Sequence, residues 1–348
     1  MTSTLVPGSP PDLAPERRPA PPRVGWLLAG VVLLALLGLA SVALGARVVG
    51  WHDIAAALTG SPEGIGQAAV EKRIPRTVLA MLVGGALGLS GAVMQGVTRN
   101  PLADPGLLGV TTGASLSVVV GIAFLGLASP ASFIWVAIAG AAVSAVFVYA
   151  VGSLGRGGAT PLKLALAGAA TSAAASSLIS AVLLPRVEML TTFRFWQIGG
   201  VGGASWARIG QVLPFLVVGA LLCLAAARGL NALALGDDVA AGLGERVART
   251  RLLAAVGAVL LCGAATAVAG PIGFVGLVVP HACRLLTGTD HRWLLPSAVL
   301  VGAALLTTAD VVGRVVARPA EIDVGIITAL VGGPFFIHLV RRQRVRAL

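Results

Sequence analysis

The feature that most constrains this chain is a series of long apolar stretches separated by short polar segments. The chain has 348 residues, of which 57% are apolar and only 11% are charged, whereas a soluble domain carries about a quarter charged residues. A helix of about 20 apolar residues is long enough to cross a bilayer. The sequence therefore predicts an all-α polytopic membrane protein.

About ten transmembrane helices are expected from these stretches. They cover residues 24–46, 77–97, 110–127, 131–152, 162–184, 209–227, 252–269, 271–287, 294–313 and 323–340. The first stretch is longer than the apolar region of a signal peptide, which has about 7–15 residues. A retained span is therefore favoured, although Leu44-Gly45-Ala46 leaves a cleaved signal as the alternative. The seven prolines of residues 1–23 predict a disordered cytoplasmic tail, and the membrane domain is then 24–348.

Lysine and arginine indicate the orientation of the chain. Ten spans place both termini on the same side of the membrane. Most of the 25 Lys and Arg residues fall in segments on that side, and cytoplasmic loops are the ones enriched in these residues. The termini are therefore expected in the cytoplasm.

Residues 84–109 combine a glycine-rich span with an abrupt break. Gly84, Gly88 and Gly91 cluster toward one side of a helix, a surface that lets backbones approach closely inside a membrane. Pro101 and Pro105 cannot continue that helix. Irregular backbone at this depth needs cover from protein or from a water-filled path. The break is either an ordinary connecting loop or the point where an inward path closes.

Several classes of function find no support in the sequence. The net charge of +11 does not indicate nucleic acid, because basic residues lie between apolar runs and the chain has one Tyr. Cys223, Cys262 and Cys283 lie inside apolar runs and are expected to be buried core residues, neither metal ligands nor a disulfide framework.

The usual signatures of catalysis are also missing from the sequence. No HExxH, no GxSxG and no pair of intramembrane carboxylates occurs. Neither Lys72 nor Lys163 belongs to a GK[ST] phosphate-binding loop. If ATP drives this protein, a separate chain must bind it, so we expect no catalytic residue, metal or cofactor in this chain.

Charged and polar side chains inside the spans are few. Gln95 lies in the second span, and Asp310 and Arg314 lie near the outer end of the ninth, four residues apart, where they can pair on one helix face. An ion-coupled secondary transporter would use Asp310 as its coupling site. The nearly charge-free spans argue against a proton relay.

Two polar segments are candidates for contacts with partners. Arg73, Arg76 and Arg314 form an outer basic set, which is either a solvated rim or a docking surface for an acidic partner. The cytoplasmic loop 228–251 predicts one short helix capped by Gly236-Asp237-Asp238 and ended by Leu243-Gly244. A second short helix should start at Glu245, and the apolar side chains of this loop suit either a partner's groove or the membrane surface. These side chains are Leu233, Leu235, Val239 and Leu243.

Five stretches together resemble one family, the permease subunits of ABC importers for iron-siderophores, haem and cobalamin (FecCD-type). They are spread in order over about four-fifths of the chain. The stretches are Arg73-Ile-Pro-Arg76, SGAVMQGVTRNPLADPGLLG at 90–109, LNALALGDDVAAGLG at 230–244, GPIGFVGLVVPH at 270–281 and ADVVGRVVARPAEIDVGIITALVGGPFF at 309–336.

The resemblance implies a type II ABC importer permease. Its expected partners are a second permease subunit in a homo- or heterodimer, two cytoplasmic P-loop ATPase subunits that bind ATP and Mg²⁺, an extracytoplasmic solute-binding protein, and a metal-chelate cargo. The leading interpretation is a ferric siderophore or similar iron chelate. A cobalamin or haem importer remains an alternative, because specificity should reside mainly in the binding protein.

The same resemblance assigns roles to individual positions. Arg73, Arg76 and Arg314 would receive carboxylates of the binding protein. Asn100, Pro101 and Leu102 would form a cytoplasmic gate, and a second gate element would lie near Thr160. The loop that couples to the ATPase would include Leu235, Gly236, Asp237, Asp238, Ala241, Gly242, Leu243 and Gly244.

Overall fold

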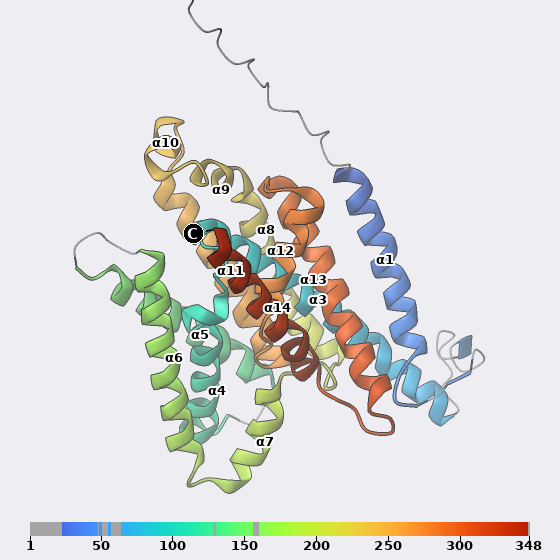
Figure 1. Ribbon diagram of the computed structural model, residues 1–348. Coiled ribbons are helices and arrows are strands. Elements are labelled where there is room, and N and C mark those ends of the chain that lie inside the picture. Colours follow the sequence, from blue (N-terminus) through green and yellow to red (C-terminus); the bar gives the residue numbers. More distant parts are fainter. Residues whose placement is uncertain are drawn as a thin grey trace, which may run out of the picture.

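The computed structural model describes residues 23–47, 49–50, 55–56, 64–127, 130–155 and 160–346, and all regular structure in this part of the chain is helical (Figure 1). The membrane-length and shorter apolar helices are α1 (Arg23–Ala43), α3 (Ile65–Thr98), α4 (Val110–Leu125), α5 (Pro130–Ser153), α6 (Pro161–Leu183), α8 (Trp206–Ala225), α11 (Val247–Ala269), α12 (Val275–Thr287), α13 (His291–Val316) and α14 (Val324–Arg346). The short elements are η1 (Pro105–Leu108), α7 (Val187–Ile198), α9 (Ala227–Leu233) and α10 (Asp237–Gly242). Apart from Arg23, the proline-rich tail lies outside the described residues.

Each of the ten predicted spans contains one helix. Within the described residues, seven helices are long and apolar enough to cross a membrane, whereas α4, α12 and the apolar part of α14 are shorter. The 16 residues of α4 rise about 24 Å, less than the roughly 30 Å of a hydrocarbon core. Helix α12 starts at Val275 and not at residue 271, because residues 271–274 are not helical.

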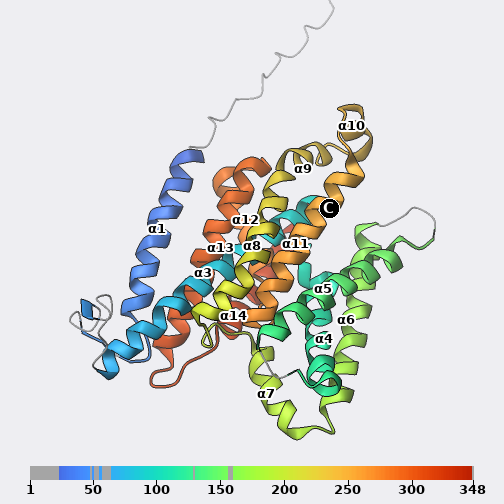
Figure 2. The same cartoon turned by 180° about the vertical axis from the view of Figure 1, so that it is seen from behind.

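The described ends of the chain lie at the same end of the bundle. Helix α1 begins, and α14 ends, toward the end that carries α9 and α10, here called the α10 end (Figures 1 and 2). The opposite end, here called the α7 end, carries α7 and the loop between α13 and α14. This arrangement agrees with an even number of crossings.

Helix α3 is the centre of the bundle and α1 lies at its edge. In the most apolar part of α3, 83% of the residues are buried, compared with 6% in the most apolar part of α1. A Cβ atom on Gly84 would lie 2.3 Å from the carbonyl oxygen of Gly302, and one on Gly91 would lie 2.1 Å from that of Gly276. The predicted close packing at the glycine surface is therefore confirmed, and the glycines bring the backbones of α13 and α12 into contact with α3.

Three local predictions about helices need correction. Helix α3 contains Pro75 and begins at Ile65, 12 residues before the start of the predicted span 77–97. The polar segment 185–208 contains α7, which was not predicted. No second short helix starts at Glu245, because the long helix α11 begins two residues later, and the additional short helix, α9, precedes α10.

The three cysteines are free thiols buried in the bundle, as predicted. Among the described residues, no three His, Cys, Asp or Glu side chains gather into a possible metal site.

Candidate functional sites at the two ends of the bundle

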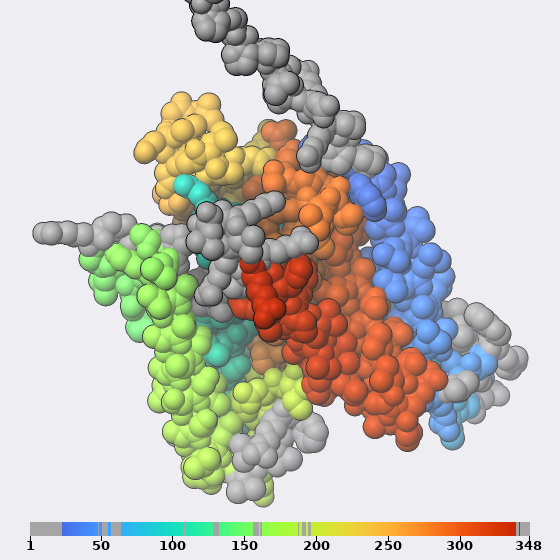
Figure 3. Space-filling model, viewed as in Figure 1, coloured from blue at the N-terminus to red at the C-terminus, as the bar shows by residue number. Residues whose placement is uncertain are grey.

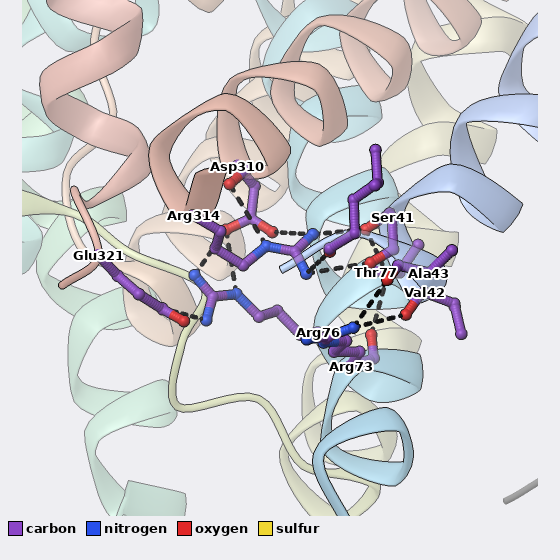
Figure 4. A network of polar contacts seen from close by, with 10 residues as sticks. Ser41, Val42, Ala43, Arg73, Arg76, Thr77, Asp310, Arg314 and Glu321 are labelled. Carbon is purple, nitrogen blue, oxygen red and sulfur yellow. Dashed lines mark hydrogen bonds and ion pairs between the residues drawn. The ribbon is translucent and has the colours of Figure 1, made fainter. Parts of the chain in front are cut away.

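An arginine–carboxylate cluster occupies the α7 end, with Arg76 at its centre (Figure 4). Arg76 donates from Nε and Nη2 to Oδ1 of Asp310, at 3.0 and 2.9 Å. Its Nη1 donates to Oε2 of Glu321 at 2.6 Å. Arg314 lies 3.0 Å from the other oxygen of Asp310, so one carboxylate serves arginines from α3 and α13. The predicted pairing of Asp310 with Arg314 is confirmed.

The other arginines of the cluster hold the end of α1. Arg314 donates to the carbonyl oxygens of Ser41 and Leu44, both at 3.0 Å, and to Oγ of Ser41 at 2.7 Å. Arg73 donates to the carbonyl oxygens of Val42, Ala43 and Arg47 at 2.6–3.1 Å. Arg318 donates to that of Gly45 at 2.8 Å. The last carbonyls of a helix lack intrahelical partners, and positive charge is favourable there.

The three arginines expected at this end are therefore not a solvated rim. Arg73 is 7% exposed and Arg314 is 1% exposed. The side chain of Arg76 is 12% exposed. Sequence reasoning missed Glu321, which lies in one of the five stretches, seven residues beyond Arg314.

At the α10 end, α3 closes with a tight turn at the predicted gate. Arg99 ends the helix in the left-handed region at φ 50°. Asn100 then accepts a hydrogen bond from the Leu102 amide through Oδ1, at 2.9 Å. This Asx-type turn spans the exposed Pro101. The three predicted gate residues thus form one compact structural unit.

The chain then turns back into the protein through η1. Asp104 caps η1 by accepting a hydrogen bond from the Gly106 amide at 2.7 Å. Its carboxylate lines a cavity of about 110 Å³ with Ser90, Thr111 and Cys262. Sequence reasoning did not single out Asp104, because its sequence neighbours give no sign that it lies inside the bundle.

The predicted coupling loop projects from the α10 end as α9 and α10. Gly236 at φ +113° and Gly244 at φ +83° bracket α10, and Asp237 and Asp238 open it, as predicted. Leu235, Val239 and Leu243 are exposed. Leu233 is fully buried instead. Ala241 and Gly242 are exposed too, so the tip of the loop presents a small apolar surface.

An ion-pair group joins this loop to the predicted gate. Asp237 of α10 pairs with Arg99, the residue directly before Asn100. Asp237 also pairs with Arg251 of α11 at 3.0 Å. The start of α10, the end of α3 and the first turns of α11 therefore meet at one carboxylate.

A second polar contact joins α9 to the start of α13. Asn231 donates to Oδ1 of Asp290 at 2.7 Å and accepts from the His291 amide at 2.9 Å. Burial alone would raise the pKa of Asp290. The hydrogen bonds from Asn231 and the Arg292 amide, with the charges of Arg292 and Arg23, hold this pKa below its ordinary value.

The region of the predicted second gate element is the start of α6. Thr160 caps this helix, its Oγ1 accepting from the Lys163 amide at 3.3 Å, and Leu162 is exposed. Residues 156–159 just before it lie outside the described part of the chain.

Comparisons with known proteins place this geometry in a family. The model of the FecCD transport family matches residues 33–342. The chain is 43% identical to the ferric enterobactin transport system permease protein FepD of Escherichia coli K12, over 90% of this chain and 94% of the relative. It is 38% identical to the hemin transport system permease protein HmuU of Yersinia pestis, over 92% and 96%.

A solved structure is similar over nearly its whole length. It is an inward-facing conformation of a metal-chelate type ABC transporter, with a TM-score of 0.78 and 29% identity, covering 92% of this chain and 99% of that one. The family model begins within α1 and ends within α14, so it covers the eight apolar helices between them and part of each of these two. This chain belongs to the FecCD transport family.

Proposed function

We propose that this bacterial membrane permease passes a ferric siderophore or a similar iron chelate into the cytoplasm, driven by ATP hydrolysis on a separate subunit. The observation that carries the proposal is the family match over residues 33–342, together with 43% identity to a ferric enterobactin permease. A haem or cobalamin cargo is the second candidate, because HmuU and a cobalamin import permease of Halobacterium salinarum, BtuC, are also relatives at 38% and 42% identity.

The α10 end is the proposed contact for the ATPase and is cytoplasmic. Leu235, Val239 and Leu243 are exposed on this loop. A partner that covers them would bury their apolar side chains, which suits the centre of an interface. The ion pairs of Asp237 would carry movement of the loop to Arg99 and thus to the turn at Asn100–Leu102. ATP and Mg²⁺ are bound by the partner and not by this chain.

The α7 end is the proposed contact for the extracytoplasmic binding protein. In the arginine–carboxylate cluster at this end, four arginines exceed the carboxylates in number, which favours an acidic partner. Because Arg73 and Arg314 hold α1, we assign the direct contact with the binding protein to Arg76 and its surroundings. The sequence had predicted this contact for all three arginines.

A second permease subunit is proposed to cover the face that carries α6 and α14. Both helices lie on the face shown in Figure 3, α6 in green and α14 in red. Both helices carry large exposed apolar side chains, among them Leu166, Leu178, Leu330 and Ile337. The path for the chelate would run between the two subunits.

Uptake by the reconstituted transporter tests the proposal. The permease is combined in liposomes with the ATPase and the binding protein encoded beside its gene. The internal ATP is then supplied or withheld. We expect ATP-dependent uptake of a ferric catecholate, hydroxamate or citrate chelate, whereas preferential uptake of haemin or cobalamin would transfer the assignment to the second candidate. Uptake driven by an ion gradient without the ATPase would overturn it.

Cross-linking tests the gate. In a dimer carrying Leu102→Cys, a disulfide between subunits should form when the path is closed at the α10 end and should stop uptake until it is reduced. Thr98→Cys, one turn earlier on α3, is the matched control. A readily formed cross-link at position 102 with normal uptake would make the turn a simple connector.

A further inference from the structure

The contacts of Arg76 differ from those of the two other predicted docking arginines. Arg73 and Arg314 direct their donors mainly to backbone carbonyls at the end of α1. Arg76 contacts no carbonyl of α1 among the described hydrogen bonds. It holds Asp310 with two nitrogens and Glu321 with the third, Nη1. This third contact connects Arg76 to an exposed carboxylate.

We propose that Glu321 occupies, in the resting permease, the position that an acidic side chain of the extracytoplasmic binding protein takes on Arg76. Docking is then an exchange of one carboxylate for another at Nη1. This inference rests on the proposed function, because it requires a partner at the α7 end.

Burial decides which of the two carboxylates leaves. Asp310 is 1% exposed and lies inside α13, so removing it from Arg76 would leave a buried charge with one partner fewer. The side chain of Glu321 is 40% exposed, and Glu321 sits in the loop between α13 and α14, where water can solvate it after release. The next residue, Ile322, is tied to α13 by a hydrogen bond from its amide to the Gly313 carbonyl at 3.0 Å. Release therefore requires only rotation of the Glu321 side chain.

Access to Nη1 also favours exchange. On one side of Nη1 lies Gly202, where even a Cβ atom would be 3.7 Å away. This position has no side chain to shield the guanidinium, so an incoming carboxylate can approach as Glu321 leaves.

Charge balance explains why an exchange is favoured over simple addition. The cluster and its surroundings hold one more arginine than carboxylates and so keep an excess of one positive charge. The arginines are Arg73, Arg76, Arg314 and Arg318, and the carboxylates are Asp310, Glu321 and Asp323. A partner carboxylate that added to Nη1 would meet the negative charge of Glu321 at short range. Displacing Glu321 removes that repulsion and keeps Arg76 fully bonded.

The experiment measures binding of the binding protein encoded beside this gene to the permease–ATPase complex in nanodiscs. In Glu321→Gln the internal competitor is weakened, and the dissociation constant should fall about two- to fivefold, as expected for loss of a partly exposed ion pair. Glu71→Gln is the matched control, because Glu71 is an exposed acid on the same helix as Arg76. It changes the net charge equally and should alter affinity much less.

The double variant tests whether Glu321 acts through Arg76. In an Arg76→Gln background, Glu321→Gln should have no further effect on the affinity for the binding protein. Cooperative thermal unfolding of the Arg76→Gln permease shows that this background is folded. Equal effects of Glu321→Gln and Glu71→Gln, or weaker binding by Glu321→Gln, would overturn the exchange. If the wild-type complex binds no such protein, the proposed function fails instead.

Discussion

Asp310 shows how a carboxylate is kept inside this bundle. It is almost completely buried, yet it meets Arg76 from α3 and Arg314 from its own helix within 3.0 Å. Removing either arginine leaves this buried carboxylate with a single ion-pair partner, which is costly in a buried site. Stability at the α7 end should therefore depend strongly on each buried arginine.

Arg314→Gln should lower the free energy of unfolding by about 3–5 kcal/mol, because it removes an ion-pair partner of Asp310 and the bonds to Ser41 and Leu44. The measurement is thermal or denaturant unfolding of the purified permease in detergent. Arg318→Gln removes the same charge from an exposed arginine that makes one bond to Gly45, and it should cost about 1 kcal/mol or less. Equal losses for the two variants would contradict the assigned role of Arg314.

Asp290 leads to a pH-dependent prediction. Its pKa is held below the ordinary value in the folded protein, so its contribution to stability is present above the unfolded-state pKa of about 3.9 and is lost as the pH falls through the lowered folded-state pKa. The difference in melting temperature between wild type and Asp290→Asn should thus be largest near neutral pH and shrink below about pH 4. Asn231→Ala should reduce the same difference, because it removes one of the hydrogen bonds responsible. A difference that does not change with pH would contradict this account.

The spacing of residues along the sequence predicted one ion pair, Asp310 with Arg314, but it could not predict the contacts between residues far apart in the chain. Asp310 and Arg314 are four residues apart on one helix, so the sequence alone brings them together. Glu321 and Arg76 are separated by 245 residues, and no local pattern encodes their contact. The burial of Arg73 and Arg314 depends on where the end of α1 lies relative to α3 and α13, and the sequence alone does not predict this position.

At the scale of elements, the glycine surface of α3 was predictable and the partners it contacts were not. Gly84, Gly88 and Gly91 repeat with the helix period, which marks a close-packing face. That the face receives α13 and α12 follows only from the fold. The start of α3 was predicted too late, because charged residues and Pro75 are typical of loops, whereas here they extend the helix beyond the apolar stretch.

Gly91→Ala should destabilise the permease by about 1–3 kcal/mol, since its Cβ would lie 2.1 Å from a carbonyl oxygen of α12 and force α3 and α12 apart. Unfolding in detergent gives the measurement. Gly210→Ala is the matched control: Gly210 lies inside α8 with nothing within 4 Å of an added Cβ. This control should leave stability unchanged or raise it by about 0.5–1 kcal/mol. Tolerance of both substitutions would show that α3 and α12 can separate freely.

Continuous helices join the two ends of the molecule at which the proposed partner contacts lie. Helix α13 begins beside Asn231 at the α10 end and reaches Asp310 and Arg314 at the α7 end. Hydropathy predicted where the apolar helices lie, whereas ten crossings and cytoplasmic termini remain predictions. The proposed contact surfaces rest on the exposure of their side chains, which depends on how the helices pack and not on their composition.

Leu243→Ser should weaken binding of the ATPase subunit about tenfold and leave the melting temperature of the isolated permease unchanged, because Leu243 is 67% exposed at the tip of the loop. Co-purification and titration of the ATPase measure the effect. Leu252→Ser, at an exposed position on α11, is the control and should bind the ATPase normally. Normal binding by Leu243→Ser would remove the loop from the interface.

The capping of α1 has a consequence for the order in which the protein is made. Helix α1 leaves the ribosome first, but the arginine that takes the Ser41 carbonyl is synthesised 273 residues later. Arg73 and Thr77 are made 30 and 36 residues after their partners Ala43 and Ser41, so these two residues can hold the end of α1 during most of translation. A nascent chain released before α13 would lack the bonds from Arg314 to the carbonyl oxygens of Ser41 and Leu44, so the end of α1 is fully held only after α13 has been made.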